Sequence, residues 1–287
     1  MADGLPYLDG EELRRLVGWP DAVDAIERAL LDGTAPGNTP LRTVVDVAAG
    51  QLLLMPAEAG AHAGVKLTSV RATAGEAPRI QGVYLLLDAT SLSPLALQDA
   101  VVLTQLRTAA VSAVAARRLA VPDASRLVVF GRGPQSDGHV EALRCVRPIR
   151  EVTVVGRDQR GVEALPDADL VACCTTAREP LFDSALLRPD ATVVAVGSHE
   201  PDAREVDTAL VRRATVVVET RASALVESGD VLLAIADGVH LDEAIDGELA
   251  DLVNGRVPVE PGRPRLFKSV GEAWGDLVLA SLAFQRR

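Results

Sequence analysis

Lysine is almost absent from this chain, which makes the two lysines present the first candidates for proton chemistry. Of the 29 basic residues, 27 are arginine and only Lys66 and Lys268 are lysine. A coding bias would turn ordinary surface lysines into arginines, whereas a retained lysine can lose its proton and an arginine cannot. Lys66 lies between Val65 and Leu67, where a long cation needs an anion or a cavity for its head. An outward-facing edge position is the alternative for Lys66.

A glycine-rich turn between a strand and a helix is the second feature with a chemical meaning. Gly131 and Gly133 follow the apolar run RLVVF and precede a helical stretch over about residues 135–146. This arrangement presents backbone N–H groups and a positive helix end to a pyrophosphate. The third glycine of the usual dinucleotide pattern is missing, because Asp137 stands two positions past Gln135. A turn without a ligand is the alternative, but the flanking strands favour a dinucleotide site.

The end of the next strand, VVGRDQ, is where dinucleotide folds meet the adenosine ribose. An acidic residue there accepts a hydrogen bond from the 2′-hydroxyl, and an arginine favours a 2′-phosphate. Arg157 and Asp158 stand side by side, so NADP and NAD both stay open, and the leading Arg157 favours NADP. Only about 11 residues separate this strand from the following one. We therefore expect the sheet to lack its outer strand on the adenosine side, which leaves the adenine end more exposed.

The first part of the chain predicts helices followed by a strand meander. Residues 1–32 carry apolar residues at helical spacing, and Pro20 starts the second run. The loop 34–40 follows. Four short runs bounded by turn residues then predict strands: RTVVDVAA, QLLLMPA, AGVKLTSV and QGVYLLLDA. The Ala-rich stretch 104–120, with Thr104 as N-cap, predicts a helix.

After Pro122 the pattern changes to strands that alternate with helices. The predicted strands are RLVVFG, EVTVVGR, DLVACCTT, ATVVAVG and ATVVVE. This alternation predicts an α/β fold with a Rossmann-type, doubly wound parallel sheet that is shortened at one edge. Residues 223–252 are expected to be helical, and FKSVGEAWGDLVLASLAF is expected to form one more helix.

Composition excludes several classes of partner and compartment. The net charge is −11 with a pI near 4.9, a field that repels nucleic acid. The longest apolar runs, such as ATVVAV and VLLAIA, are far shorter than the roughly 20 residues of a membrane helix. Cys145, Cys173 and Cys174 do not form a disulfide framework. With no basic-then-apolar leader at the start, we expect a cytoplasmic protein.

A set of motifs runs through nearly the whole chain: PLRTVVDV, LMPA, GVKLTSV, LTQLRTAAVSA, GRGPQS followed by His139, TTAREPLF, AVGSHEPDAREVDTALV, ESGDVLL and FKSVG. By these motifs the chain resembles the ornithine cyclodeaminase/mu-crystallin family. The LTxxRTAA segment and the VGSxxPDxRE(L/V)D segment are specific to that family. The similarity is greatest to the mu-crystallin branch, which implies ketimine reduction rather than ornithine cyclisation.

The resemblance implies a discontinuous α+β domain for substrate binding and dimerisation, made of residues 1–121 and 266–287. An inserted dinucleotide-binding domain would comprise residues 122–265. Family members use NAD or NADP for hydride chemistry at the α-carbon of amino acids or cyclic imino acids. A homodimer that binds a small imino or amino acid is therefore expected.

The resemblance also implies roles for individual residues. Arg42 matches a residue that holds the substrate carboxylate, and Lys66 matches a catalytic lysine that contacts the substrate. Arg107 matches a catalytic residue between substrate and cofactor, and Val270 a residue beside the substrate. The positions that match the cofactor site are Arg107, Thr108, Gly131, Gly133, Gln135, Ser136, Thr175, Thr176 and Ser269. A surface cation for Arg42 and a helix-to-helix salt bridge for Arg107 are the alternatives.

One position departs from the family pattern. Cyclodeaminases carry an aspartate where this chain has His199, and that aspartate handles the protons of amine loss and ring closure. Its absence argues against cyclodeamination, although a histidine can act as acid or base near neutral pH. A solvated loop histidine is the alternative.

These features together predict an NAD(P)-dependent oxidoreductase. It would reduce the C=N bond of a small imino acid, or oxidise an amino acid in reverse. Two alternatives stay open: an ornithine cyclodeaminase-type ammonia lyase, and a non-catalytic protein of the mu-crystallin type that binds NADP and a small ligand.

Overall fold

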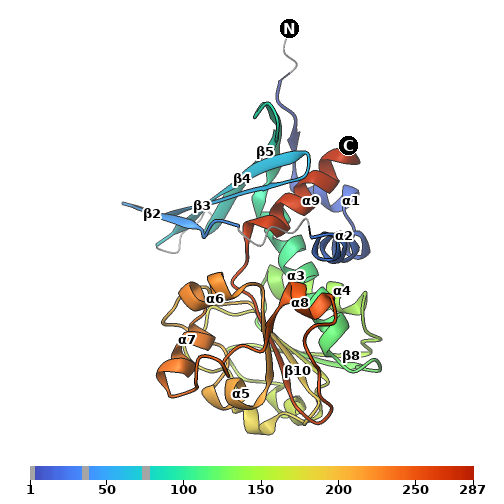
Figure 1. Ribbon diagram of the computed structural model, residues 1–287, viewed down its shortest axis with the longest axis vertical. Helices are drawn as coiled ribbons and strands as arrows, with labels where there is room; N and C mark the ends of the chain where they lie inside the picture. The colour runs from blue at the N-terminus through green and yellow to red at the C-terminus, as the bar shows by residue number, and fades with distance from the viewer. Residues whose placement is uncertain (1–3, 34–38, 73–77) are drawn as a thin grey trace. The chain divides into compact units, whose positions relative to one another are not determined.

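The structure is a computed structural model that describes residues 4–33, 39–72 and 78–287 (Figure 1). Of the expected loop 34–40, residues 34–38 lie outside the described residues. Five strands follow one another between α2 and α3, and from β7 onward strands alternate with helices.

The chain forms two compact units, which are described separately. The first unit consists of Met1–Arg107 with Glu272–Arg287, and the second consists of Thr108–Gly271. The first division falls inside helix α3 (Ala100–Leu119). The assignment of a substrate domain and a dinucleotide domain stays a prediction.

A six-stranded sheet forms the centre of the first unit, in the order β1-β6-β5-β4-β3-β2. Strands β2 to β6 pair antiparallel and confirm the predicted meander, while β1 pairs parallel with β6. The strands are β1 (Tyr7–Leu8), β2 (Thr43–Val47), β3 (Gly50–Ala59), β4 (His62–Arg71), β5 (Ile80–Asp88) and β6 (Pro94–Asp99). Strands β1 and β6 are not among the strands expected from the sequence.

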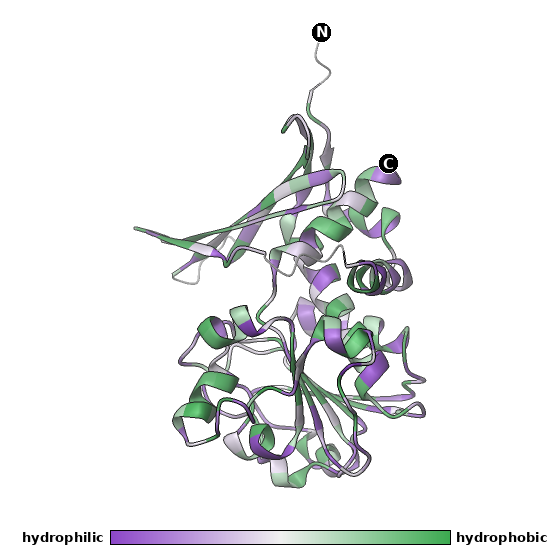
Figure 2. Ribbon diagram, in the orientation of Figure 1, coloured by the Kyte–Doolittle hydropathy of each residue, from purple (hydrophilic) through white to green (hydrophobic). Residues whose placement is uncertain are grey.

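Three helices complete the first unit: α1 (Gly10–Leu16), α2 (Trp19–Leu31) and α9 (Ala273–Gln285). The Asp9 side chain accepts hydrogen bonds from two backbone N–H groups and starts α1, and Pro20 stands in the first turn of α2. Helix α2 buries an apolar stripe, and Figure 2 shows hydrophobic and hydrophilic residues on this helix. Helix α9 packs on β3, β4 and β5.

The face of this sheet that α9 covers contains a row of four neighbouring side chains. Met55, Lys66, Tyr84 and Gln98 are paired across β3, β4, β5 and β6. All four are buried, because alternate residues of a strand point to the same face and this face lies under a helix. The row thus contains a lysine, a phenol and an amide in a buried position.

The second unit is built on a seven-stranded sheet in the order β12-β11-β13-β10-β9-β7-β8, and every neighbouring pair is parallel. The strands are β7 (Arg126–Phe130), β8 (Glu151–Val155), β9 (Leu170–Cys173), β10 (Thr192–Ala195), β11 (Thr215–Val218), β12 (Gly247–Glu248) and β13 (Arg265–Lys268). The predicted Rossmann-type sheet is confirmed. Its strand order reverses between β7 and β9, and in such sheets ligands bind at that point, outside the carboxyl ends of the strands.

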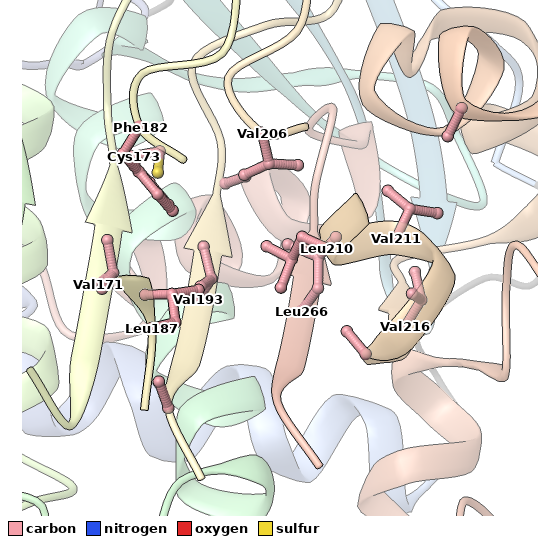
Figure 3. Close-up of a cluster of buried hydrophobic side chains, with 14 of the residues drawn as sticks. Val171, Cys173, Phe182, Leu187, Val193, Val206, Leu210, Val211, Val216 and Leu266 are labelled. Atoms are coloured by element: carbon pink, nitrogen blue, oxygen red, sulfur yellow. The ribbon is translucent and has the colours of Figure 1, made fainter. Parts of the chain in front are cut away.

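The apolar core of the second unit packs against this sheet. Figure 3 shows Val171, Val193 and Leu266 on the adjacent strands β9, β10 and β13, with Leu210 and Val211 of α5 (Thr208–Arg213) beside them. Because the strands are buried on both faces, their sequences are continuous apolar runs rather than alternating ones.

The sheet ends at β8, the edge that the sequence predicts to be shortened. Between β8 and β9 the chain forms only a short 3₁₀ helix, Val162–Asp167, and then returns to the other side of β7. Every residue of this unit is described, and no strand lies beyond β8. The connection is too short for a helix and a further strand.

Two expectations about element boundaries are wrong. Helix α3 starts at Ala100 rather than near Thr104, because the Asp99 side chain accepts hydrogen bonds from the N–H groups of Val101 and Val102. The segment RLFK forms strand β13, inserted between β10 and β11, and α9 starts only at Ala273. A segment of four residues is too short for its periodicity to distinguish a strand from a helix.

The expected helix over residues 223–252 is also wrong in part. The chain there forms α6 (Arg221–Glu227), α7 (Gly229–Ala236) and α8 (Leu249–Val253), with the two-residue strand β12 before α8. Gly238 follows α7 with a φ of +93°, a conformation that ends a helix. None of the helices in the described ranges has the length and hydrophobicity that crossing a membrane requires.

Candidate active site

Lys66 lies in the middle of β4 with a side chain that is only 3% exposed. Its ammonium Nζ donates to Asp276 Oδ2 at 2.7 Å and to Thr104 Oγ1 at 3.2 Å. The outward-facing alternative for Lys66 is therefore wrong. A buried lysine whose ammonium contacts a carboxylate and a hydroxyl is a candidate for proton transfer.

Asp276 is the residue of this cluster that the sequence analysis missed. It lies in the first turn of α9, is fully buried, and binds Arg107 Nε through Oδ1 at 3.3 Å in addition to Lys66. One carboxylate thus holds two cations that come from β4 and α3. The sequence signal was a lone acidic residue within the apolar stretch WGDLVLASLAF, since a buried carboxylate needs a cation.

Arg107 retains a free donor although it is buried. Its Nη1 has no hydrogen-bond partner among the described residues, while Nε binds Asp276. The expected alternative, an ion pair to another helix, is thus present but leaves part of the guanidinium unused. Buried polar groups are rarely left without a partner, so this donor indicates an anionic ligand such as a carboxylate.

The electrostatic surroundings lower the pKa of Lys66 to about 8. Burial is the largest cause, and the charges of Arg107 and Arg42 lower the pKa further, while Asp276 raises it. Arg42 is half-buried just before β2 and is near enough to act on the ammonium. Lys66 is therefore an acid that can give up its proton near neutral pH.

The glycine-rich turn between β7 and α4 (Pro134–Arg144) is built for close approach of a ligand. Gly131 has a φ of +115°, and a Cβ there would lie 2.7 Å from the carbonyl oxygen of Cys174. Gly133 is the N-cap of α4 without a capping side chain, and the N–H groups of Ser136 and Asp137 donate to its carbonyl oxygen. Ser136 Oγ and Gln135 Oε1 are buried with no partner among the described residues. A helix N-terminus without a side-chain cap and the unpartnered Ser136 hydroxyl, which can donate, fit a pyrophosphate.

The other predicted cofactor positions also belong to the second unit. Thr175 lies two residues after the end of β9, its N–H and hydroxyl donate to Glu205, and the exposed Thr176 comes next. Ser269 and Val270 are buried after β13, and Thr108 is buried in α3. His199 is exposed on the segment that follows β10.

The end of β8 carries a cluster of arginines around one acid. Asp158 pairs with Arg132 Nη2 at 3.4 Å and with Arg160 Nε at 3.7 Å. Arg132 lies directly over Gly156, where a Cβ would be 2.8 Å from its Cζ. Arg157 is exposed beside them. Asp158 is thus already engaged by two cations, and the exposed Arg157 beside it is available to meet an anion.

His139 links α4 to α3 through hydrogen bonds at both of its ring nitrogens. Its Nδ1 donates to the carbonyl oxygen of Gln135 at 2.7 Å, so Nε2 accepts from Ser112 Oγ at 2.9 Å. The ring is fully buried, and this burial lowers its pKa from 6.5 to about 4. The imidazole therefore stays neutral in the folded protein and acts as a structural link behind the glycine-rich turn.

We expect His139 to make folding stability depend on pH between about 6.5 and 4. In this window the unfolded chain binds a proton that the folded chain does not, so stability falls as pH falls, by up to about 1.4 kcal/mol per pH unit. Urea unfolding at pH 7 and pH 5 should show a smaller difference for His139→Gln than for the unchanged protein. Equal differences would contradict this assignment.

Within the described residues, no three His, Cys, Asp or Glu side chains are grouped so that they could hold a metal ion. The groups gathered in the first unit are instead the buried Lys66, the guanidinium of Arg107 and the carboxylate of Asp276, and those of the second unit are a helix N-terminus and hydroxyls. These are the groups expected for an anionic substrate and a dinucleotide.

Comparison with known families bears directly on this arrangement. The model of the ornithine cyclodeaminase/mu-crystallin family matches residues 11–167 and 162–287. The chain belongs to this family. The resemblance inferred from the motifs is thereby confirmed over nearly the whole length.

Individual members of the family are similar over most of their length. Ketimine reductase mu-crystallin of Mus musculus is 35% identical over 269 residues, which cover 85% of this chain and 84% of that protein. Δ1-pyrroline-2-carboxylate reductase of Bacillus cereus is 31% identical, with 97% and 95% covered. The structure of Thermococcus litoralis Δ1-pyrroline-2-carboxylate reductase in complex with NADH and L-proline has a TM-score of 0.91 and 30% identity, covering 98% of this chain and 97% of that one.

Proposed function

We propose that this protein is an NAD(P)-dependent imine reductase that acts on a small cyclic or linear imino acid. The observation that carries the proposal is the buried cluster of Lys66, Asp276 and Arg107, in a family whose similar members are named ketimine and pyrroline-2-carboxylate reductases. An acid of suitable pKa and a guanidinium with a free donor suit an imine that bears a carboxylate.

Each group of the cluster has a distinct task in this reaction. Arg107, through its free Nη1, and Arg42 bind the substrate carboxylate and fix the plane of the C=N bond. When bound, the nicotinamide cofactor supplies a hydride to the imine carbon. The Lys66 ammonium donates a proton to the nitrogen, which becomes the amine. Asp276 stabilises the charged form of Lys66 before the transfer and holds its head in place.

The second unit supports binding of the dinucleotide. The uncapped first turn of α4, with Ser136 and Gln135, suits the pyrophosphate. Thr108, Thr175, Thr176, Ser269 and Val270 are the further positions proposed around the cofactor and substrate.

The function is tested by mixing the protein with a panel of cyclic and linear imino acids and following the loss of reduced nicotinamide. Consumption of at least one imine with NADPH or NADH is the expected result. Tight cofactor binding without turnover on any imine would instead favour a ligand-binding protein.

We expect NADPH to bind more tightly than NADH, because Asp158 is engaged by two arginines and Arg157 is not. Loss of a charge-assisted hydrogen bond costs about 1.5–3 kcal/mol, so Arg157→Ala should weaken NADPH binding by roughly tenfold or more and leave NADH nearly unchanged. Fluorescence titration of both cofactors measures this. Arg256→Ala is the matched control, since Arg256 is exposed and pairs with Asp251 elsewhere. Tighter binding of NADH would overturn the preference.

We also propose that the protein is a homodimer formed through the sheet of the first unit. On the face opposite Lys66, Leu54, Leu67 and Val83 form an apolar row across β3, β4 and β5, and Leu67 is 38% exposed. Strand β2 adds exposed valines, and Figure 2 shows its hydrophobic colour. Apolar surface of this kind marks an interface. Leu67→Asp should convert a dimer into a monomer in sedimentation analysis, whereas a monomeric parent protein would contradict the proposal.

The three cysteines are free thiols, which supports a reducing compartment, and we propose that the protein is cytoplasmic.

A further inference from the structure

Lys268, the second of the two lysines, is buried in the second unit and has no part in the proposed chemistry. It is the last residue of β13, and its side chain is fully buried. Its Nζ lies 2.9 Å from Asp230 Oδ2 and donates to the backbone carbonyl oxygen of Ser198 at 2.7 Å. Removing an ammonium from water is energetically costly, so the buried Lys268 side chain would be unstable without both of these close partners.

Asp230 connects Lys268 to the backbone of Glu205, which carries a second buried carboxylate. It stands in the first turn of α7, and its Oδ1 accepts hydrogen bonds from the N–H groups of Glu205 and Val206 at 2.7 and 3.0 Å. The Glu205 side chain is also fully buried. Its Oε1 accepts from the N–H and hydroxyl of Thr175, and its Oε2 accepts from the N–H of Gly197.

These contacts join three motifs that are far apart in the sequence. Lys268 belongs to FKSVG, Glu205 to PDAREVD and Asp230 to ESGD. Lys268 is paired in register with Ala195, which is paired with Cys173. The Lys268–Asp230–Glu205 network therefore ties together the carboxyl ends of β9, β10 and β13, the edge of the sheet where ligands bind in this fold.

Two glycines show how tightly the segments fit around the network. A Cβ at Gly197 would lie 1.9 Å from the carbonyl oxygen of Thr175, and one at Gly229 would lie 2.1 Å from that of Ala203. No other residue fits at either place without moving the backbone. The segment 197–203, which carries Ser198 and His199, is thus held at Gly197 by Glu205 and at Ser198 by Lys268.

We propose that Lys268 is a positioning residue that sets the place of the segment 197–203 for hydride transfer, through the carbonyl of Ser198. This inference rests on the proposed function, because hydride transfer is the step for which the segment 197–203 is positioned. Lys268 makes no proton transfer itself. It orients the backbone beside His199, and Asp230 and Glu205 keep the three strand ends in one arrangement.

A purely structural ion pair is the competing explanation, and charge-matched variants separate the two. Lys268→Met leaves Asp230 buried without its cation, which should lower the melting temperature. The double variant Lys268→Met/Asp230→Asn removes both charges and keeps an oxygen for the N–H groups of Glu205 and Val206. Neutral replacement of a buried pair commonly restores stability. It does not restore the hydrogen bond to Ser198.

The experiment compares melting temperature, kcat and KM for the imine, and amide hydrogen exchange of residues 197–203. We expect the double variant to regain most of the melting temperature, to keep a loss in kcat of roughly 10- to 100-fold with little change in KM, and to exchange faster at 197–203. Arg188→Met is the matched control, since Arg188 pairs with Asp169, which likewise accepts from two backbone N–H groups, but at the amino end of β9. It should change stability and not kcat.

Recovery of kcat together with stability in the double variant would overturn the positioning role. If the unchanged protein reduces no imine, the proposed function fails, and amide exchange then decides the inference. Faster exchange at 197–203 in the stable double variant supports a hold on this segment by Lys268, and unchanged exchange refutes it.

Discussion

Replacement of Lys66 by methionine is expected to lower kcat/KM for imine reduction by on the order of 100-fold or more, as for loss of a general acid. The variant removes the only ammonium that Asp276 and Thr104 hold in the described part of the first unit. Lys66→Arg should lose a similar amount, because arginine keeps the charge but does not release a proton, and its planar head differs in shape. Steady-state kinetics with the preferred imine and cofactor measure both variants.

The control addresses folding rather than chemistry. In Lys66→Met the Asp276 carboxylate keeps its ion pair with Arg107, so the variant should keep most of the melting temperature of the unchanged protein while staying inactive. A Lys66 variant with near-normal rates would show that this lysine is structural.

The pH profile supplies an independent check on the same residue. With a pKa of about 8, Lys66 is protonated below this value, so the rate should decline as pH rises above it. Asp276 raises this pKa, so Asp276→Asn should move the decline to lower pH. If the rate of Asp276→Asn declines at the same pH as that of the unchanged protein, a group other than Lys66 causes the decline.

Much of the fold follows from the sequence, because its strands are short apolar runs with clear turn residues between them. The strand–turn–helix around Gly131 and the short link after β8 were predictable for this reason. Strand β13 was not, since RLFK adjoins a long helical stretch and its place between β10 and β11 depends on distant partners. The start of α3 was missed because Asp99, not Thr104, supplies the cap.

The cationic residues of the candidate site were predictable from the sequence, but the residues that pair with them were not. Lys66 stood out by rarity, but its carboxylate is Asp276, 210 positions away in the chain. The same holds for Lys268, whose contacts with Asp230 and Ser198 form only when β13 enters the sheet. Ion pairs over such distances leave no periodic pattern in a single sequence.

The protein is expected to reduce a cyclic ketimine and to leave L-ornithine unchanged. Cyclodeamination oxidises the amine, releases ammonia, closes the ring and returns the hydride, so each middle step moves a proton on or off nitrogen. A carboxylate serves these steps, and the motif resemblance predicts that His199 stands where cyclodeaminases have that aspartate. Imine reduction needs one hydride and one proton, and Lys66 or a water supplies the proton.

Incubation with L-ornithine and catalytic NAD⁺ should therefore yield neither proline nor ammonia, while a cyclic ketimine is consumed with NADPH. Proline formation at a comparable rate would establish the cyclodeaminase alternative. His199→Asp gives the converse test at a position that is exposed after β10, where the change does not disturb the core. If the variant gains ornithine cyclisation, the residue at 199 selects between the two reactions. If it reduces imines but gains no cyclisation, the selection lies elsewhere, with the buried Lys66 and Asp276 cluster as the next place to alter.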